Sequence, residues 1–462
     1  MHLSADPFRK KLVHLTVTGA EVQKRHKCAK LLRNRKQVLR LRNRESCGTD
    51  VNTPTCFPQE SPNTMDRFRE PSTLSRVLSL DAMRGGAALA VVTYHALGVA
   101  PRTATSGWEA LLPQITAYVV HFAYAGVYLF FVISGFCIHL YWAKTHATGV
   151  QTPVINFFSF WKRRVRRLYP AYIAALVLYL CYLASKTHVE VTGFYVWDVV
   201  LHLFMLHNVD PRTTYTINGA FWTLAIEEQL YLAYFLLLFL RIRFGWTRTL
   251  VVCFSARIAW VILSRYLANS FSIHIPVGEA AATNWFIWAL GALSVEAAVG
   301  VIKLPAWCYR ISTASVALGC AMVLAQALPL LDNKALIHDI GWTVMHPAWG
   351  VGFFILVNYA ATAEQRRREK SSPEPLLITA LAPIGLISYS LYLTHSFVLM
   401  HWYWFGFTRL HILSISLLIV APLSVVFAWL FFRVLERPFM RSVAVKAPVK
   451  SQASAALALN EQ

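Results

Sequence analysis

The chain has 462 residues, of which 56% are hydrophobic and 15% are charged, and its mean hydropathy is +0.45. Soluble proteins carry roughly 25% charged residues, so this composition excludes an ordinary soluble protein and indicates an integral membrane protein. The net charge of +21 does not indicate a nucleic-acid partner, because Lys and Arg lie in short clusters between apolar runs, as in cytoplasmic loops.

Residues 1–76 differ from the rest of the chain. A strongly basic stretch is followed at 51–73 by a segment rich in Pro, Ser, Thr and Asn, which predicts a disordered cytoplasmic segment that lies on anionic lipid. Alternatively, translation starts at Met65, shortly before the first apolar run. A chain that begins at Met65 is therefore expected to insert and work normally, and residues 441–462 are expected to form a disordered tail.

Residues 77–440 are expected to form one all-α domain, a polytopic membrane bundle of about ten transmembrane helices with both termini in the cytoplasm. The segment 195–209 is too short and too polar for a span. Treating it as non-spanning places every later basic cluster on the cytoplasmic side. The predicted helices lie near 78–99, 117–141, 170–186, 221–241, 249–268, 284–302, 311–330, 342–362, 383–404 and 411–433.

The first predicted helix carries two polar residues in an apolar setting, Arg84 and His95. They are eleven residues apart, which on a helix means nearly the same face and a separation of ~16 Å. Charged or polar groups at this depth usually face a cavity and mark function. The alternative is that Arg84 reaches the lipid headgroups while His95 makes a helix–helix hydrogen bond.

Two further predicted helices carry ionisable groups within the membrane. Glu227 and Glu228 are adjacent, so they point to different faces and only one is expected to face the interior. That carboxylate is a candidate to orient His95 or to activate a hydroxyl group. His395 is expected at a depth similar to that of His95, although a structural hydrogen-bonding role is the more common one for a lone membrane histidine.

A basic cluster precedes the third predicted helix, with Arg163, Arg164 and Arg167. Such clusters ordinarily anchor a helix at the cytoplasmic surface. Arg side chains also suit the recognition of phosphate groups. The eight cysteines contain no C-x-x-C pair, and we expect neither a disulfide framework nor a metal site.

Together, these segments resemble the acyltransferase-3 family of integral membrane O-acyltransferases over residues 77–439. Several motifs occur in the order typical of that family, with small departures at Gly86, Thr223 and Thr394. The matching segments are Leu80 to Leu89 with His95, Phe130 to Ile138 with Ser134, Arg163 to Pro170, Trp222 to Tyr231, Ile387 to His395 through Tyr392, and Glu436 with Pro438.

The resemblance implies an enzyme that transfers an acyl group, most often acetyl from acetyl-CoA, to a hydroxyl of a carbohydrate. The expected partners are acyl-CoA, a cell-surface, exported or lipid-linked glycan, and the lipid of the inner or plasma membrane, with no bound cofactor. The expected catalytic residues are His95, Glu227, Glu228 and His395. The expected substrate-binding residues are Arg84, Ser134, Arg163, Arg164, Arg167 and Tyr392.

Two other classes of protein remain as alternatives. Intramembrane His, Glu and Arg also form proton relays in transporters, but the sequence contains no matching halves that indicate inverted repeats. A sensor or scaffold is disfavoured by the short loops. Consumption of acyl-CoA by the purified protein would distinguish an enzyme from both.

Overall fold

The computed structural model describes residues 77–99, 121–150, 152–186, 192–328, 335–404 and 419–440. The two expected terminal segments, 1–76 and 441–462, lie outside the described residues. Within the described residues, all regular structure is helical, so the predicted all-α class is confirmed. The eleven α-helices are α2 (Leu78–Val99), α4 (Gly126–Ala147), α5 (Phe157–Lys186), α6 (Gly193–Leu203), α7 (Trp222–Phe271), α8 (Ala281–Ala298), α9 (Ile311–Ala327), α10 (Ala335–Glu369), α11 (Leu376–Leu386), α12 (Ser388–Trp404) and α14 (Ala421–Phe431).

Several of these helices are long and apolar enough to cross a membrane. Among the described residues there are four such segments, and a fifth if the bent pair α11 and α12 forms one span. The predicted count of about ten spans and the placement of both termini stay predictions. The four segments are Phe122–Ala147, Phe157–Lys186, Trp222–Phe271 and Thr343–Glu369.

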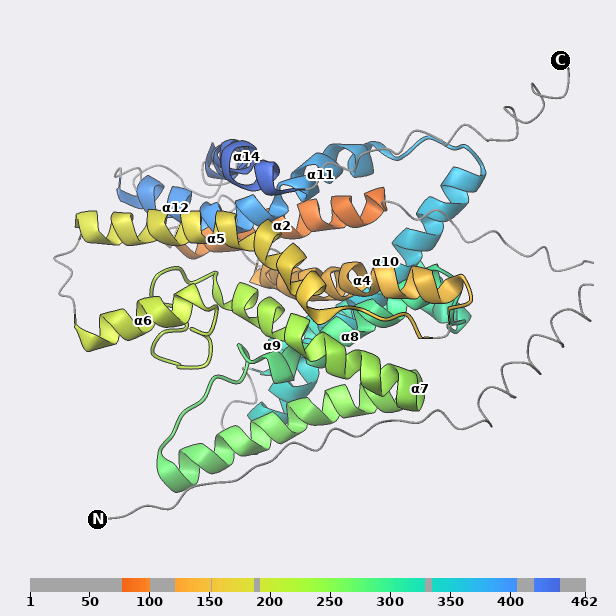
Figure 1. The fold of residues 1–462 in the computed structure, drawn as a ribbon, viewed down its shortest axis with the longest axis horizontal. Helices are drawn as coiled ribbons and strands as arrows, with labels where there is room; N and C mark the ends of the chain where they lie inside the picture. Colours follow the sequence, from red (N-terminus) through yellow and green to blue (C-terminus); the bar gives the residue numbers. More distant parts are fainter. Residues whose placement is uncertain are drawn as a thin grey trace, which may run out of the picture. The chain divides into compact units, whose positions relative to one another are not determined.

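Helix α7 contains a sharp break at Gly245, where it folds back on itself (Figure 1). Gly245 has φ 76° and ψ 172°, a backbone conformation that is essentially restricted to glycine. The two halves correspond to the separate helices predicted at 221–241 and 249–268. The basic residues Arg241, Arg243 and Arg248 lie beside the break, at the end of the apolar runs.

Helix α6 has only 11 residues, or about 16 Å of length, against a hydrocarbon core of ~30 Å. Its length fits the prediction that the segment 195–209 does not span the membrane. The chain continues from α6 into an irregular segment, residues 204–221, that leads directly into α7.

The structure departs most from the predicted helices at two places. Helix α5 begins at Phe157 and not near residue 170, so the basic cluster lies on the helix itself. A helix can carry these charges because most of the basic side chains are exposed. The single helix predicted at 383–404 is two helices, α11 and α12, bent by 73°. Because of the bend at Ile387, α11 packs along α2, while α12 runs in another direction and contacts α2 over a shorter stretch.

Helices α2 and α11 are in close backbone contact. A Cβ atom on Gly85 would overlap the carbonyl oxygen of Leu381, and one on Gly385 would overlap that of Asp81. A similar pair, Gly135 and Gly291, joins α4 to α8. Small residues at such crossings allow tight van der Waals packing between membrane helices. These contacts fix the position of α2, which carries both Arg84 and His95.

The start of α2 is capped by a side chain from α10. Both carboxylate oxygens of Glu364 accept hydrogen bonds from backbone N–H groups, from Leu78 at 3.0 Å and from Ser79 at 2.7 Å. Arg368 pairs with the same carboxylate at 2.5 Å. The free N–H groups at a helix start favour a negative charge, so this contact helps to hold α2 in register.

Candidate active site

One cavity, of about 240 Å³, lies at the end of the molecule where the basic cluster of α5 is found. Arg84 from α2 and Arg164 and Arg167 from α5 line it, so three guanidinium groups converge from two helices. We call it the inner cavity. Its other polar lining residues are Asp81, Ser134, Thr223, Glu227, Tyr231, Ser388, Tyr389, Tyr392 and Glu436.

The cations of the inner cavity are held by different contacts. Arg84 lies within 3.4 Å of the Cys137 sulfur, while the Arg164 guanidinium lies over the rings of Phe160 and Tyr231, at 5.4 and 5.8 Å from their centroids. Arg163 is exposed and is not among the lining residues. The structure therefore brings together three of the four predicted cations.

Glu227 and Glu228 have different surroundings, but the expectation that only one of them faces the interior is wrong, because one lines a cavity and the other is buried. Glu227 lines the inner cavity beside Arg84 and accepts a hydrogen bond from the Tyr231 hydroxyl at 3.4 Å. Ser134 is a second hydrogen-bonding neighbour of Glu227 and also accepts one from Trp288 at 3.3 Å. Glu228 is buried and lines neither cavity.

A second and larger cavity, of about 630 Å³, contains His95. We call it the outer cavity. Its walls come from α2, α4, α10 and the segments that precede α7 and α8, and they are rich in aromatic rings. The polar and aromatic lining residues are Tyr94, His95, His121, Tyr124, Tyr128, Tyr215, Trp222, Glu279, His346 and Tyr392.

The hydrogen bond of His95 determines which ring nitrogen can act as a base. Its Nδ1 lies 2.9 Å from the backbone carbonyl oxygen of Val91, one turn earlier on α2. A carbonyl only accepts, so Nδ1 carries the proton and Nε2 carries the lone pair. The expectation that Glu227 or Glu228 orients His95 is corrected here: Val91 holds the tautomer, and Glu227 lies in the other cavity.

His395 from α12 lies directly beside His95, with 5.0 Å between the ring centroids. Its Nδ1 is held by the carbonyl oxygens of Tyr392 at 2.8 Å and Leu391 at 3.2 Å, so its proton is also on Nδ1. Ser396 approaches its Nε2 at 3.3 Å. His395 is fully buried and is not among the residues that line either cavity. It therefore packs against the His95 ring without facing the outer cavity itself.

Tyr392 and Val127 line both cavities, so the two meet at these residues. The hydroxyl groups of Tyr392 and Thr223, at the start of α7, are 2.7 Å apart and share a hydrogen bond. Each hydroxyl can donate or accept, so the pair places a hydrogen-bonding group where the two cavities meet. A chain of side chains thus leads from the three cations of the inner cavity, past Tyr392, to His95.

Several polar residues, some in the outer cavity and one outside it, were not predicted from the sequence. Tyr215 and Glu279 lie on irregular segments, where polar residues are ordinary and carry no signal. His346 and Glu296 lie in apolar stretches. An ionisable residue in such a stretch often marks a functional site, so these two could have been singled out from the sequence. Glu296 forms a buried network with His139 at 2.9 Å and Arg241 at 2.8 Å, away from both cavities.

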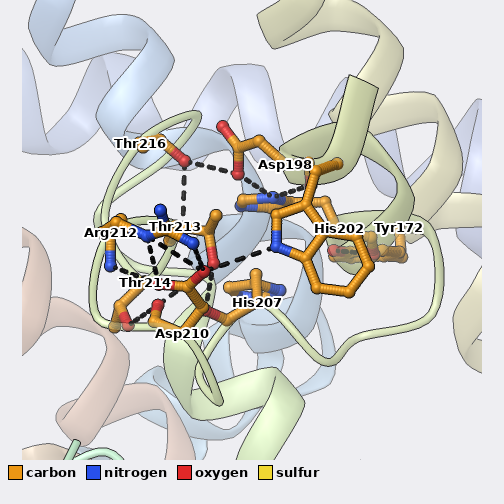
Figure 2. Close-up of polar contacts among 10 residues, drawn as sticks. Tyr172, Asp198, His202, His207, Asp210, Arg212, Thr213, Thr214 and Thr216 are labelled. Atoms are coloured by element: carbon orange, nitrogen blue, oxygen red, sulfur yellow. Dashed lines mark hydrogen bonds and ion pairs between the residues drawn. The ribbon is translucent and has the colours of Figure 1, made fainter. Parts of the chain in front are cut away.

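The segment that carries Tyr215 is fixed by the hydrogen bonds drawn in Figure 2. Asp198 pairs with His202 at 3.0 Å and accepts a hydrogen bond of 2.9 Å from Thr216. His202 and His207 are stacked, with ring centroids 4.0 Å apart. The short helix α6 thereby holds the wall of the outer cavity in place.

No metal-binding group of three or more His, Cys, Asp and Glu side chains occurs in the part of the chain that the structure describes. The chemistry available in the two cavities is that of fixed cations at one end and an imidazole base at the other. Between them lies the hydroxyl group of Tyr392, which lines both cavities.

Comparisons with known proteins identify the family of the chain. A family model for the acyltransferase domain matches residues 77–433. The chain is 29% identical over 186 residues to the peptidoglycan O-acetyltransferase OatA of Listeria monocytogenes, covering 36% of this chain and 25% of the relative. It is 27% identical over 166 residues to the O-acetyltransferase OatA of Staphylococcus aureus, covering 34% and 23%.

The chain therefore spans about a quarter of the length of these relatives. No solved structure matches it. The family model covers well over half of the chain and includes every residue from Arg84 to His395 that was singled out above. The chain belongs to the acyltransferase-3 family of membrane acyltransferases.

Proposed function

We propose that the protein transfers an acyl group, most often acetyl, from acyl-CoA to a hydroxyl group of a cell-surface or exported glycan. The observation that carries this proposal is that the inner and outer cavities meet at Tyr392, with cations in one and His95 in the other. The relatives named as O-acetyltransferases, one of them acting on peptidoglycan, support a glycan acceptor.

The donor occupies the inner cavity in this scheme. Acyl-CoA is made in the cytoplasm, and its phosphates are dianionic or monoanionic groups that pair well with Arg forks. Arg164 and Arg167 meet these phosphates, while Arg84 and the Glu227–Tyr231 pair lie further along. A cavity of about 240 Å³ holds only part of such a molecule, so the adenosine end lies at the exposed surface near Arg163.

The transfer takes place where the cavities meet. His95 Nε2 removes the proton of the acceptor hydroxyl, whose oxygen attacks the thioester carbon. The Tyr392 hydroxyl donates to the oxygen on which negative charge develops. The C–S bond then breaks, the CoA thiolate takes up the proton that His95 removed, and the CoA thiol leaves toward the inner cavity. His95 acting as a transient acyl carrier is a second route with the same residues.

The topology belongs to the same proposal. About ten helices cross the inner or plasma membrane, with both termini and the Arg163–Arg167 cluster in the cytoplasm and the outer cavity open to the other side. Labelling of single cysteines placed at residues 166 and 274 from each side of the membrane tests this sidedness. Labelling of both positions from the same side would contradict it.

Expression in a glycan-producing bacterial host tests the function. Mass spectrometry of the extracted glycan is expected to show ester-linked acyl groups with the intact chain and none with His95→Ala. The membrane content of both proteins serves as the control for folding. Equal acylation by the two proteins would contradict the role of His95, and no acylation by the intact chain would contradict the proposed function.

A further inference from the structure

The outer cavity contains a single carboxylate among its described lining residues. Glu279 lies in the segment that joins α7 to α8, next to the start of α8 at Ala281. The other polar lining groups are imidazoles and hydroxyls, and neither Lys nor Arg appears among those lining residues. Glu279 is therefore the one acidic side chain that these lining residues present to a ligand.

Glu279 is fixed at both its backbone and its side chain. The Tyr215 hydroxyl donates a hydrogen bond to its Oε1, and its backbone carbonyl accepts one of 2.7 Å from Asn208. Asn208 is in turn paired with Gln229 of α7 at 2.7 Å. An ionised carboxylate has about four acceptor positions, so the hydrogen bond from Tyr215 leaves capacity for a ligand.

The buried cation Arg257 is not among the residues that line the outer cavity. It lies on α7 and is 1% exposed. Its N–H groups are directed to the backbone carbonyls of Thr283 at 2.5 Å and Thr343 at 2.9 Å, and to His346 at 3.3 Å. A ligand in the outer cavity therefore meets the carboxylate and not the guanidinium.

Aromatic rings line the cavity between Glu279 and His95. The ring centroids of Tyr94 and Tyr124 lie 6.0 Å apart, and those of Tyr124 and Tyr128 lie 6.5 Å apart. Aromatic faces carry partial negative charge and attract the polarised C–H groups on the face of a sugar ring. Such a wall suits a rigid, polyhydroxylated ring better than a flexible acyl chain.

We infer that the outer cavity selects a neutral sugar as the acceptor, with Glu279 accepting hydrogen bonds from two of its hydroxyl groups. Hydrogen bonds to an ionised acceptor are roughly twice as strong as neutral ones. A sugar that carries a carboxylate or phosphate at this position would be repelled by Glu279, because both groups are negatively charged. This repulsion would select against acidic sugars. This inference rests on the proposed function and adds the class of acceptor to it.

Purified full-length protein in lipid nanodiscs provides the test. Transfer from acetyl-CoA is measured to a tetrasaccharide of glucose and to the same tetrasaccharide with one glucuronic acid. The intact protein is expected to have the higher kcat/KM for the neutral compound. In Glu279→Gln the ratio of the two kcat/KM values is expected to fall by about tenfold or more, because a charge-assisted hydrogen bond is lost and a repulsion is removed.

The comparison of two acceptors separates recognition from a structural role. A merely structural change would lower transfer to both acceptors in the same proportion. If Glu279 recognises the acceptor, the KM for acetyl-CoA should be the same in Glu279→Gln as in the intact protein. Glu374→Gln removes the same charge from the α10–α11 connection, where it pairs with Arg367 at 3.1 Å, and should leave the ratio unchanged. A ratio that does not change in Glu279→Gln overturns the inference and leaves the proposed function standing. No transfer to either acceptor by the intact protein overturns both.

Discussion

At the scale of single residues, the site depends on the tautomer of one histidine. The Val91 carbonyl holds the proton of His95 on Nδ1, so in the proposed reaction Nε2 is the nitrogen that acts as base, without help from a carboxylate. The sequence predicted Arg84, His95 and Glu227 as functional because charged and polar groups are costly in an apolar helix. It did not predict Tyr215 or Glu279, because polar groups on irregular surface segments need no special explanation.

The two adjacent glutamates provide a prediction at this scale. Glu227→Gln is expected to lower kcat/KM for acyl-CoA by about tenfold or more. The reason is that Glu227 lines the inner cavity beside Arg84, and the substitution removes the charge that interacts with this cation. Glu228→Gln is expected to cost less, since Glu228 lines neither cavity. Steady-state kinetics of the two purified variants give the comparison, and a larger loss in Glu228→Gln would contradict the assignment of Glu227.

At the scale of helices, α2 is the element that organises the site. Its position depends on the close crossing with α11 and on the Glu364 cap at its start. Hydropathy gave the approximate positions of most helices because apolar runs are the dominant signal in a membrane protein. It did not locate the bend at Ile387 or the early start of α5, since both depend on which neighbours the backbone contacts and on charged residues at the membrane surface.

The α2–α11 crossing leads to a prediction with a matched control. Gly85→Ala would place a Cβ atom against the Leu381 carbonyl oxygen, and such overpacking costs about 1–3 kcal/mol. Gly86→Ala places its Cβ 3.9 Å from the nearest atom, a Leu381 methyl group, and should be tolerated. Thermal unfolding of both variants in detergent tests the crossing. Equal melting temperatures would show that α2 and α11 are not packed this closely.

The segment at 204–221 is expected to respond to pH. Burial, with His202 beside it, lowers the pKa of His207 to about 3, against ~6.5 in an unfolded chain. The folded state therefore holds His207 neutral, while the unfolded segment takes up a proton below pH ~6.5. Stability of the segment falls as the pH drops below that value, by about 1 kcal/mol per pH unit until the folded pKa is reached.

Hydrogen exchange of this segment measures the effect. After correction for intrinsic exchange chemistry, protection is expected to be lower at pH 5 than at pH 7. His207→Asn cannot titrate in this range and should show a smaller difference between the two pH values. An equal difference in both proteins would mean that another group is responsible.

At the scale of the whole molecule, the polar and aromatic groups of the site divide between two cavities. Cations gather in the inner cavity at one end of the helices, and aromatic rings with one carboxylate gather in the outer cavity at the other. The motifs in the sequence indicated which residues matter, but not that they divide between two cavities. That division depends on how α2, α7 and α12 pack, which no single segment of the sequence determines.

The most direct test of this account is transfer of radiolabelled acetyl from acetyl-CoA to glycan by the purified protein in nanodiscs. The intact protein should yield labelled glycan. Arg84→Ala should chiefly raise the KM for acetyl-CoA, while His95→Ala should abolish transfer with acetyl-CoA still bound. Undiminished transfer by His95→Ala would contradict the central claim that the two substrates react at His95, where the inner and outer cavities meet.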